Sequence, residues 1–110
     1  MLVICYGQPK SASSFVHKIT NNLIEEAGFD QAATRAKCLG DISVPYAPHP
    51  YFVEFKEGDV RKIVARMDAT DVLVLKCHGN YLGEVGDLVK AGQVKVIYSY
   101  REPRDCVLSL

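Results

Sequence analysis

Two continuous apolar runs and a third, mostly apolar one constrain what this chain can fold into more than any other feature of it. Leu2 to Tyr6 and Val72 to Leu75 lack polar alternation, which is typical of strands covered on both faces. Val94 to Tyr98 contains Lys95 and is expected to form the next strand. Amphipathic segments separate these runs, and such alternation predicts a parallel sheet with right-handed crossovers. The expected fold class is therefore α/β, a parallel β-sheet flanked by helices.

The first helix is predicted directly from hydrophobic periodicity. Apolar residues recur every four positions from Phe15 to Ala27 and form one stripe, which is expected to face the core. Gly28 is suited to the position that ends such a helix. His17 falls away from this stripe and is expected on the solvated side.

The segments between the later runs are less regular. A second amphipathic helix is expected to start at Asp59, and a short one is expected over 82–92. Gln31 to Leu39 fits either a helix or, in its last residues, a short strand. Val44 to Phe52 contains three prolines and is expected to form an ordered, aromatic-rich loop.

Composition excludes several classes of protein. Thirteen basic side chains balance thirteen acidic ones, so broad electrostatic attraction to nucleic acid or to an anionic membrane is not expected. No segment resembles a signal peptide or a membrane span. The widely spaced Cys5, Cys38, Cys77 and Cys106 favour reduced thiols in a cytoplasmic setting over disulfides or a metal site.

Two segments resemble anion-binding loops, because each joins a buried strand to the start of a helix. Tyr6 to Phe15 contains Lys10 and a group of serines, and Tyr100 to Ser109 contains Pro103, a suitable first-turn residue near Arg104. The first loop lacks the Gly-x-x-x-x-Gly-Lys pattern of nucleotide kinases. In the simplest alternative, its serines only cap a helix.

Together, three elements in order resemble the sulfotransferases that use 3′-phosphoadenosine 5′-phosphosulfate (PAPS). Pro9 to Phe15 is similar to the 5′ loop of that family, Pro-Lys-Ser-Gly-Thr-Thr-Trp. The segment from Arg101 to Ser109 reproduces the spacing of the family's 3′ segment, with Pro103 and an aspartate between them. Lys76-Cys77-His78 looks like the Lys-Thr-His element that the family places at a strand end.

The resemblance implies a role for each matched residue. His78 would be the base that deprotonates the acceptor, Lys10 would steady the leaving oxygen, and Lys76 would lie near the transferring group. Phe15 stands where the family places a tryptophan against adenine, and Arg101 and Ser109 would bind the 3′-phosphate. The implied cofactor-binding set is Lys10, Ser11, Ala12, Ser13, Ser14, Phe15, Arg101 and Ser109, with PAPS as co-substrate and no metal ion.

The resemblance implies that residues 1–110 form the N-terminal part of a sulfotransferase domain with a P-loop NTPase-like, three-layer architecture. The acceptor would be a small molecule or a glycan carrying a hydroxyl or amine. Tyr46, Tyr51 and Phe52 of the proline-rich loop are candidates to line its pocket, whereas His49 of the same loop is expected to have no catalytic role. Self-association through an uncovered edge or face is expected. The alternatives are a non-catalytic module that binds phosphoadenosine nucleotides and a P-loop-like protein that binds another anion or none.

Overall fold

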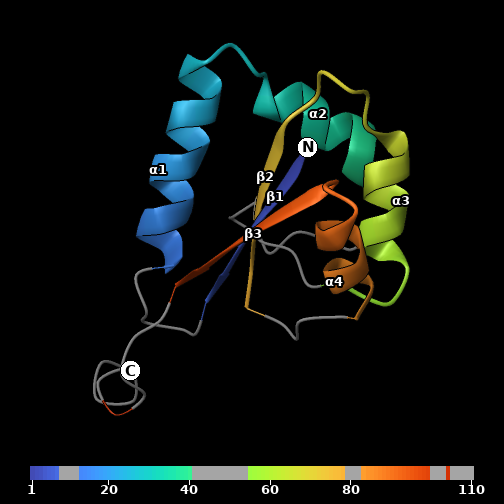
Figure 1. The fold of residues 1–110 in the computed structure, drawn as a ribbon. Coiled ribbons are helices and arrows are strands. Elements are labelled where there is room, and N and C mark those ends of the chain that lie inside the picture. The colour runs from blue at the N-terminus through green and yellow to red at the C-terminus, as the bar shows by residue number, and fades with distance from the viewer. Residues whose placement is uncertain (8–12, 41–54, 79–82, 100–103, 105–110) are drawn as a thin grey trace.

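The computed structural model describes residues 1–7, 13–40, 55–78, 83–99 and 104 of the chain. The helices and strands alternate in the manner that the apolar runs predict (Figure 1). Their bounds, in chain order, are β1 Leu2–Gly7, α1 Ser13–Glu26, α2 Gln31–Leu39, α3 Asp59–Arg66, β2 Leu73–Cys77, α4 Gly83–Lys90 and β3 Val94–Ser99.

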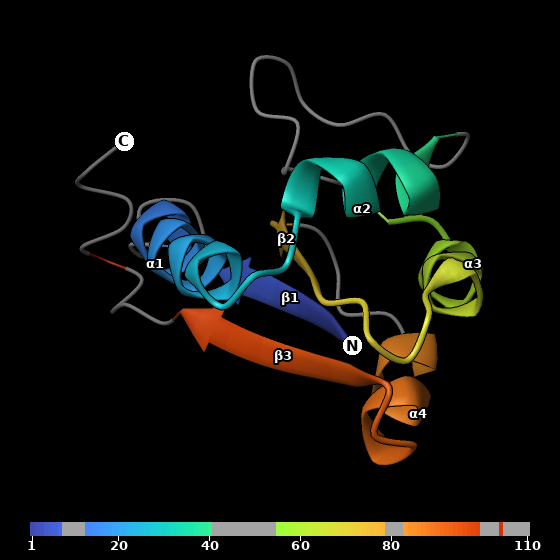
Figure 2. The same ribbon diagram turned by 90° about the horizontal axis from the view of Figure 1, so that it is seen from above.

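Within the described residues, the strands form one parallel sheet in the order β2-β1-β3. Every residue of β1 and β2 is buried, as the continuous apolar runs predict. Figure 2 shows α1 on one side of the sheet and α3 and α4 on the other, with α2 next to β2. The predicted α/β class, a parallel sheet flanked by helices, is confirmed.

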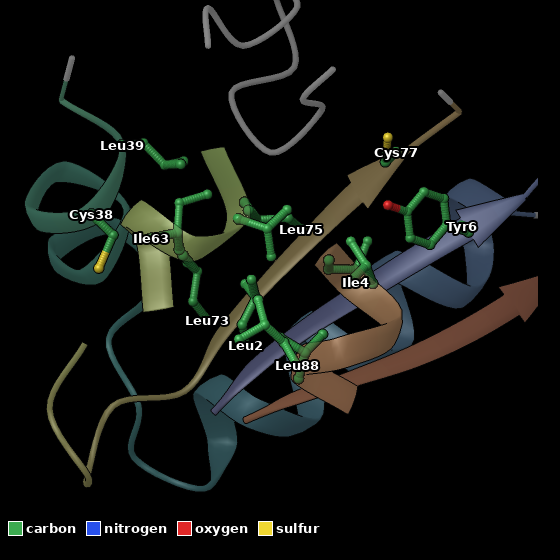
Figure 3. Packing of buried hydrophobic residues seen from close by; sticks show 13 residues of the cluster. Leu2, Ile4, Tyr6, Cys38, Leu39, Ile63, Leu73, Leu75, Cys77 and Leu88 are labelled. Atoms are coloured by element: carbon green, nitrogen blue, oxygen red, sulfur yellow. The ribbon is translucent and has the colours of Figure 1, made fainter. Parts of the chain in front are cut away.

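Successive residues of a strand point to opposite faces of the sheet, so each face has its own hydrophobic cluster. The cluster on one face is larger than that on the other. Leu2, Ile4 and Tyr6 of β1 face the larger cluster, in which they pack against residues of β2 and of the helices α2, α3 and α4 (Figure 3). Val3 and Cys5 face the smaller cluster with Val74, beneath α1. Most of the apolar burial therefore lies on the side away from α1.

The structure confirms the helix predicted from Asp59 and the short helix before Gly92. It also settles the ambiguous segment, because Gln31–Leu39 is a helix. The Oδ1 atom of Asp30 accepts a hydrogen bond from the backbone of Ala33 at 3.0 Å, which satisfies one of the helix's otherwise unpaired amides. Asp30, placed directly before Gln31, is the sequence signal that identifies this segment as a helix.

The first helix is confirmed, but the face predicted to be buried is wrong. Phe15, Ile19 and Leu23 are 65%, 44% and 61% exposed, whereas His17 is only 3% exposed. At about 100° per residue, Ile19 lies roughly 160° around the helix from His17. The face that meets the sheet instead carries His17 and the half-buried Ile24. Gly28 ends α1 as predicted, with φ of 100°.

Gln31 protects the outer edge of β2. Its Nε2 donates to the carbonyl of Val72 at 2.7 Å, and its Oε1 accepts from the amide of Val74 at 2.9 Å. These are the two backbone groups that another strand would bond on that edge. The side chain is fully buried, so one amide group both closes the edge and fixes α2 beside it.

Candidate functional site

The candidate site lies at the carboxyl edge of the parallel sheet. The three strands end there at Gly7, Cys77 and Ser99, and α1 begins at Ser13, the first described residue after β1. In open α/β sheets, ligands bind outside the carboxyl ends of the strands, and a helix that begins there favours an anion. The topology therefore brings two of the three predicted elements to one edge.

His78 follows β2 and reaches across to the neighbouring strand. Its Nδ1 lies 2.5 Å from the carbonyl oxygen of Gly7, the last residue of β1. A carbonyl oxygen only accepts a hydrogen bond, so Nδ1 must carry the proton. In the neutral ring, Nε2 then holds the lone pair. The contact fixes both the tautomer and the orientation of the ring, as a general base requires.

Lys76 lies on the face of the sheet that α1 covers. Its partner in the strand register is Cys5, which belongs to the cluster beneath α1. The lysine is 8% exposed, and this burial lowers the pKa of its ammonium group because the charged form loses hydration. A buried cation at this edge is compatible with an anionic ligand.

Cys77 lies between these two residues but points the other way. It is fully buried in the larger hydrophobic cluster with Tyr6 and Leu75 (Figure 3), so its thiol contributes to packing. Cys5, Cys38 and Cys77 are free cysteines, as their spacing predicts. Burial raises the pKa of the Cys5 and Cys38 thiols, which keeps them in the poorly nucleophilic protonated form.

His17 is a correction to the sequence-based prediction, because it lies beneath α1 and not on the solvated side. Burial lowers its pKa to about 4. The positive charges of Lys76 and Arg35 act in the same direction, while a hydrogen bond with the backbone of Val74 opposes them. His17 is therefore neutral at pH 7.

This burial predicts a pH dependence of stability. The unfolded chain binds a proton at His17 below the ordinary pKa of 6.5, whereas the folded chain resists it down to about 4. Protonation therefore favours unfolding, and the free energy of unfolding should fall as the pH is lowered from 6.5 towards 4. Urea titrations across this range measure the slope, and the neutral variant His17→Gln should flatten it. An equal slope in both proteins would contradict this assignment.

The remaining predicted site residues are described to different extents. Phe15 is exposed in the first turn of α1, where a flat ligand can reach its ring. Ser13 and Ser14 begin α1, and nothing further is described of their side chains. Other residues named in the sequence analysis lie outside the described residues: Lys10, Ser11, Ala12, Arg101, Ser109 and the loop residues Tyr46, His49, Tyr51 and Phe52.

Ser99 is a polar residue at this edge that the sequence reasoning missed. It ends β3, pairs with Gly7 in the register and is 6% exposed. Its buried Oγ has no hydrogen-bond partner among the residues that the structure describes. A serine that closes an apolar run is the only signal that the sequence offered.

A metal site and a membrane-spanning helix are both absent from the described part of the chain. In these residues, no group of three or more histidine, cysteine or acidic side chains is placed to hold a metal ion. None of the helices described is long and apolar enough to span a bilayer. Comparison of the chain with protein-family models, with curated proteins and with solved structures finds no match.

Proposed function

We propose that this chain is the nucleotide-binding part of a sulfotransferase, which transfers a sulfuryl group from PAPS to a hydroxyl or amine acceptor. The observation that carries the proposal is the contact between His78 and Gly7. It joins the Lys76-Cys77-His78 element to the strand that leads into the Lys10 loop, and it orients a candidate base there. The finer architecture proposed is P-loop NTPase-like, with the 5′ loop between β1 and α1.

The described residues fit an anionic co-substrate at this edge. Lys76 is a buried cation, and α1 is fourteen residues long and starts at the same edge, where its dipole favours negative charge. Both features would be stabilised by phosphate or sulfate oxygens. The co-substrate supplies the activated sulfuryl group, and the chain supplies position and charge.

The reaction assigns one task to each group. His78 accepts the proton of the acceptor at Nε2 as the acceptor oxygen or nitrogen forms its bond to sulfur. The bond between sulfur and the bridging phosphate oxygen breaks in line, and that oxygen keeps the electron pair. Lys10 and Lys76 offset the negative charge that develops there. The products are the sulfated acceptor and 3′-phosphoadenosine 5′-phosphate (PAP).

Calorimetric titration with PAP tests the proposal. We expect binding that is lost in Lys10→Ala and in Arg101→Ala, because these side chains would hold the 5′ and 3′ phosphates. Lys62→Ala, on the exposed face of α3, is the control and should bind PAP like the unaltered chain. Absence of binding, or binding unaffected by Arg101→Ala, would overturn the nucleotide assignment. PAP binding without any sulfuryl transfer would favour the non-catalytic alternative.

A further inference from the structure

The outward side of α1 presents an apolar stripe that no described element covers. Phe15, Ile19 and Leu23 follow one another along it at intervals of four residues and are all exposed. The small, exposed Ala27 continues the stripe directly after the helix. The other exposed large apolar residues are Val89 on α4 and Ile97 and Tyr98 on β3, the strand that contacts α1. A stripe of this kind on a helix is typical of helix–helix packing.

We propose that α1 packs against α1 of a second copy of this chain, in antiparallel orientation. A twofold axis near the middle of the stripe would place Ile19 against Leu23 of the partner subunit. The same axis would place the small Ala27 of the partner subunit beside Phe15, and because alanine covers little of a phenyl ring, one face of that ring stays open to the proposed nucleotide. Each apolar residue of the stripe then has an apolar counterpart.

The charges beside the stripe favour this orientation. Lys18, Asn22 and Glu26 form an exposed row along one side of it, again at intervals of four residues. In the antiparallel pair, Lys18 would lie opposite Glu26 of the partner subunit, and the two copies of Asn22 would meet near the axis. In a parallel pair, the twofold axis would run along the helices and place the two copies of this row on opposite sides of the interface, so Lys18 would not meet Glu26 of the partner subunit.

The size of the stripe determines how stable the pair can be. A helix of this length is about 21 Å long and about 10 Å wide with its side chains. The area buried by two such faces is smaller than the roughly 1,200 Å² at which stable interfaces begin. The dimer is therefore reversible and depends on protein concentration in the micromolar range.

Sedimentation velocity of the whole chain across that range tests the interface. We expect dimers to appear as the concentration rises, and Leu23→Glu should raise the dissociation constant at least about tenfold. Val89→Glu introduces the same charge at an exposed apolar residue on α4 and should dimerise like the unaltered chain. A chain that stays monomeric, or a Leu23→Glu variant that dimerises normally, would overturn the proposal. The second result would also indicate that the chain dimerises through another surface, such as the edge of β3.

A charge exchange tests the orientation independently of the apolar contacts. Lys18→Glu and Glu26→Lys should each weaken the dimer, and the double variant should restore it because the opposite charges face each other again. Lys62→Glu on α3 is the matched control and should change nothing. A double variant that is as weak as either single one would exclude the antiparallel arrangement.

Discussion

Replacing His78 with alanine is expected to lower the rate of sulfuryl transfer by about 10²–10⁴-fold, the usual contribution of a general base. The affinity for PAP should change little, because in the proposed mechanism this side chain acts on the acceptor and not on the nucleotide. Single-turnover measurements with PAPS and a phenol or amine acceptor give the rate, and calorimetry gives the affinity. Loss of both together would indicate a structural role.

The contact between His78 and Gly7 provides a sharper control for this prediction. In His78→Asn, the side-chain amide nitrogen can take the place of Nδ1 and donate to the Gly7 carbonyl. That variant keeps the strand-to-strand contact but has no lone-pair nitrogen at the position of Nε2. We expect it to be as inactive as the alanine variant and more stable. An active asparagine variant would show that His78 only supports the edge of the sheet.

The second large effect concerns stability and the core between the sheet and α3 and α4. Leu75 is fully buried in the larger cluster (Figure 3), so Leu75→Ala removes buried methyl groups and leaves a cavity. Such substitutions cost about 2–5 kcal/mol, which in a domain of this size lowers the melting temperature by roughly 4–8 °C for each kcal/mol. Urea and thermal unfolding followed by circular dichroism measure both quantities.

Leu23→Ala is the matched control, because it makes the same chemical change on a residue that is 61% exposed. Both residue types favour helix, so the variant should differ from the unaltered chain by about 0.5 kcal/mol or less. The comparison should be made at low concentration, where the proposed dimer is dissociated. A large loss of stability in Leu23→Ala would mean that the stripe on α1 is buried within a single copy.

The strands and three of the four described helices were predictable from local pattern. A continuous apolar run can avoid water only if both faces are covered, and this condition located β1 and β2. The mostly apolar run over 94–98 located β3, which is only partly buried. The stripe that begins at Val60 and Ile63 located α3, because these two buried residues lie about one helical turn apart. In β1, in β2 and at the start of α3, the residues that the pattern predicts to be buried are buried in the structure.

The first helix shows where that reasoning fails. Its most regular apolar residues are exposed, whereas His17 is buried and forms a hydrogen bond with the backbone of Val74 in β2. The face of α1 that meets the sheet also carries a hydroxyl, Thr20, whose Oγ1 donates to the carbonyl of Val16 at 2.8 Å. Periodicity shows which residues share a face, but not which face a neighbouring element covers. The proposed packing against a second copy of the chain accounts for the apolar stripe that is exposed in a single copy.

The sequence by itself determined the α/β class, the places of the strands and the order of the three candidate motifs. The tertiary structure decided which side of α1 is buried, how Gln31 closes the edge of β2, and that His78 meets Gly7 across the strand ends. The physical reason is the range of the interactions. Strand and helix patterns depend on residues a few positions apart, whereas the bonds of Gln31 span 41 and 43 residues and that of His78 spans 71. Only the folded arrangement of the sheet brings such distant groups within hydrogen-bonding distance.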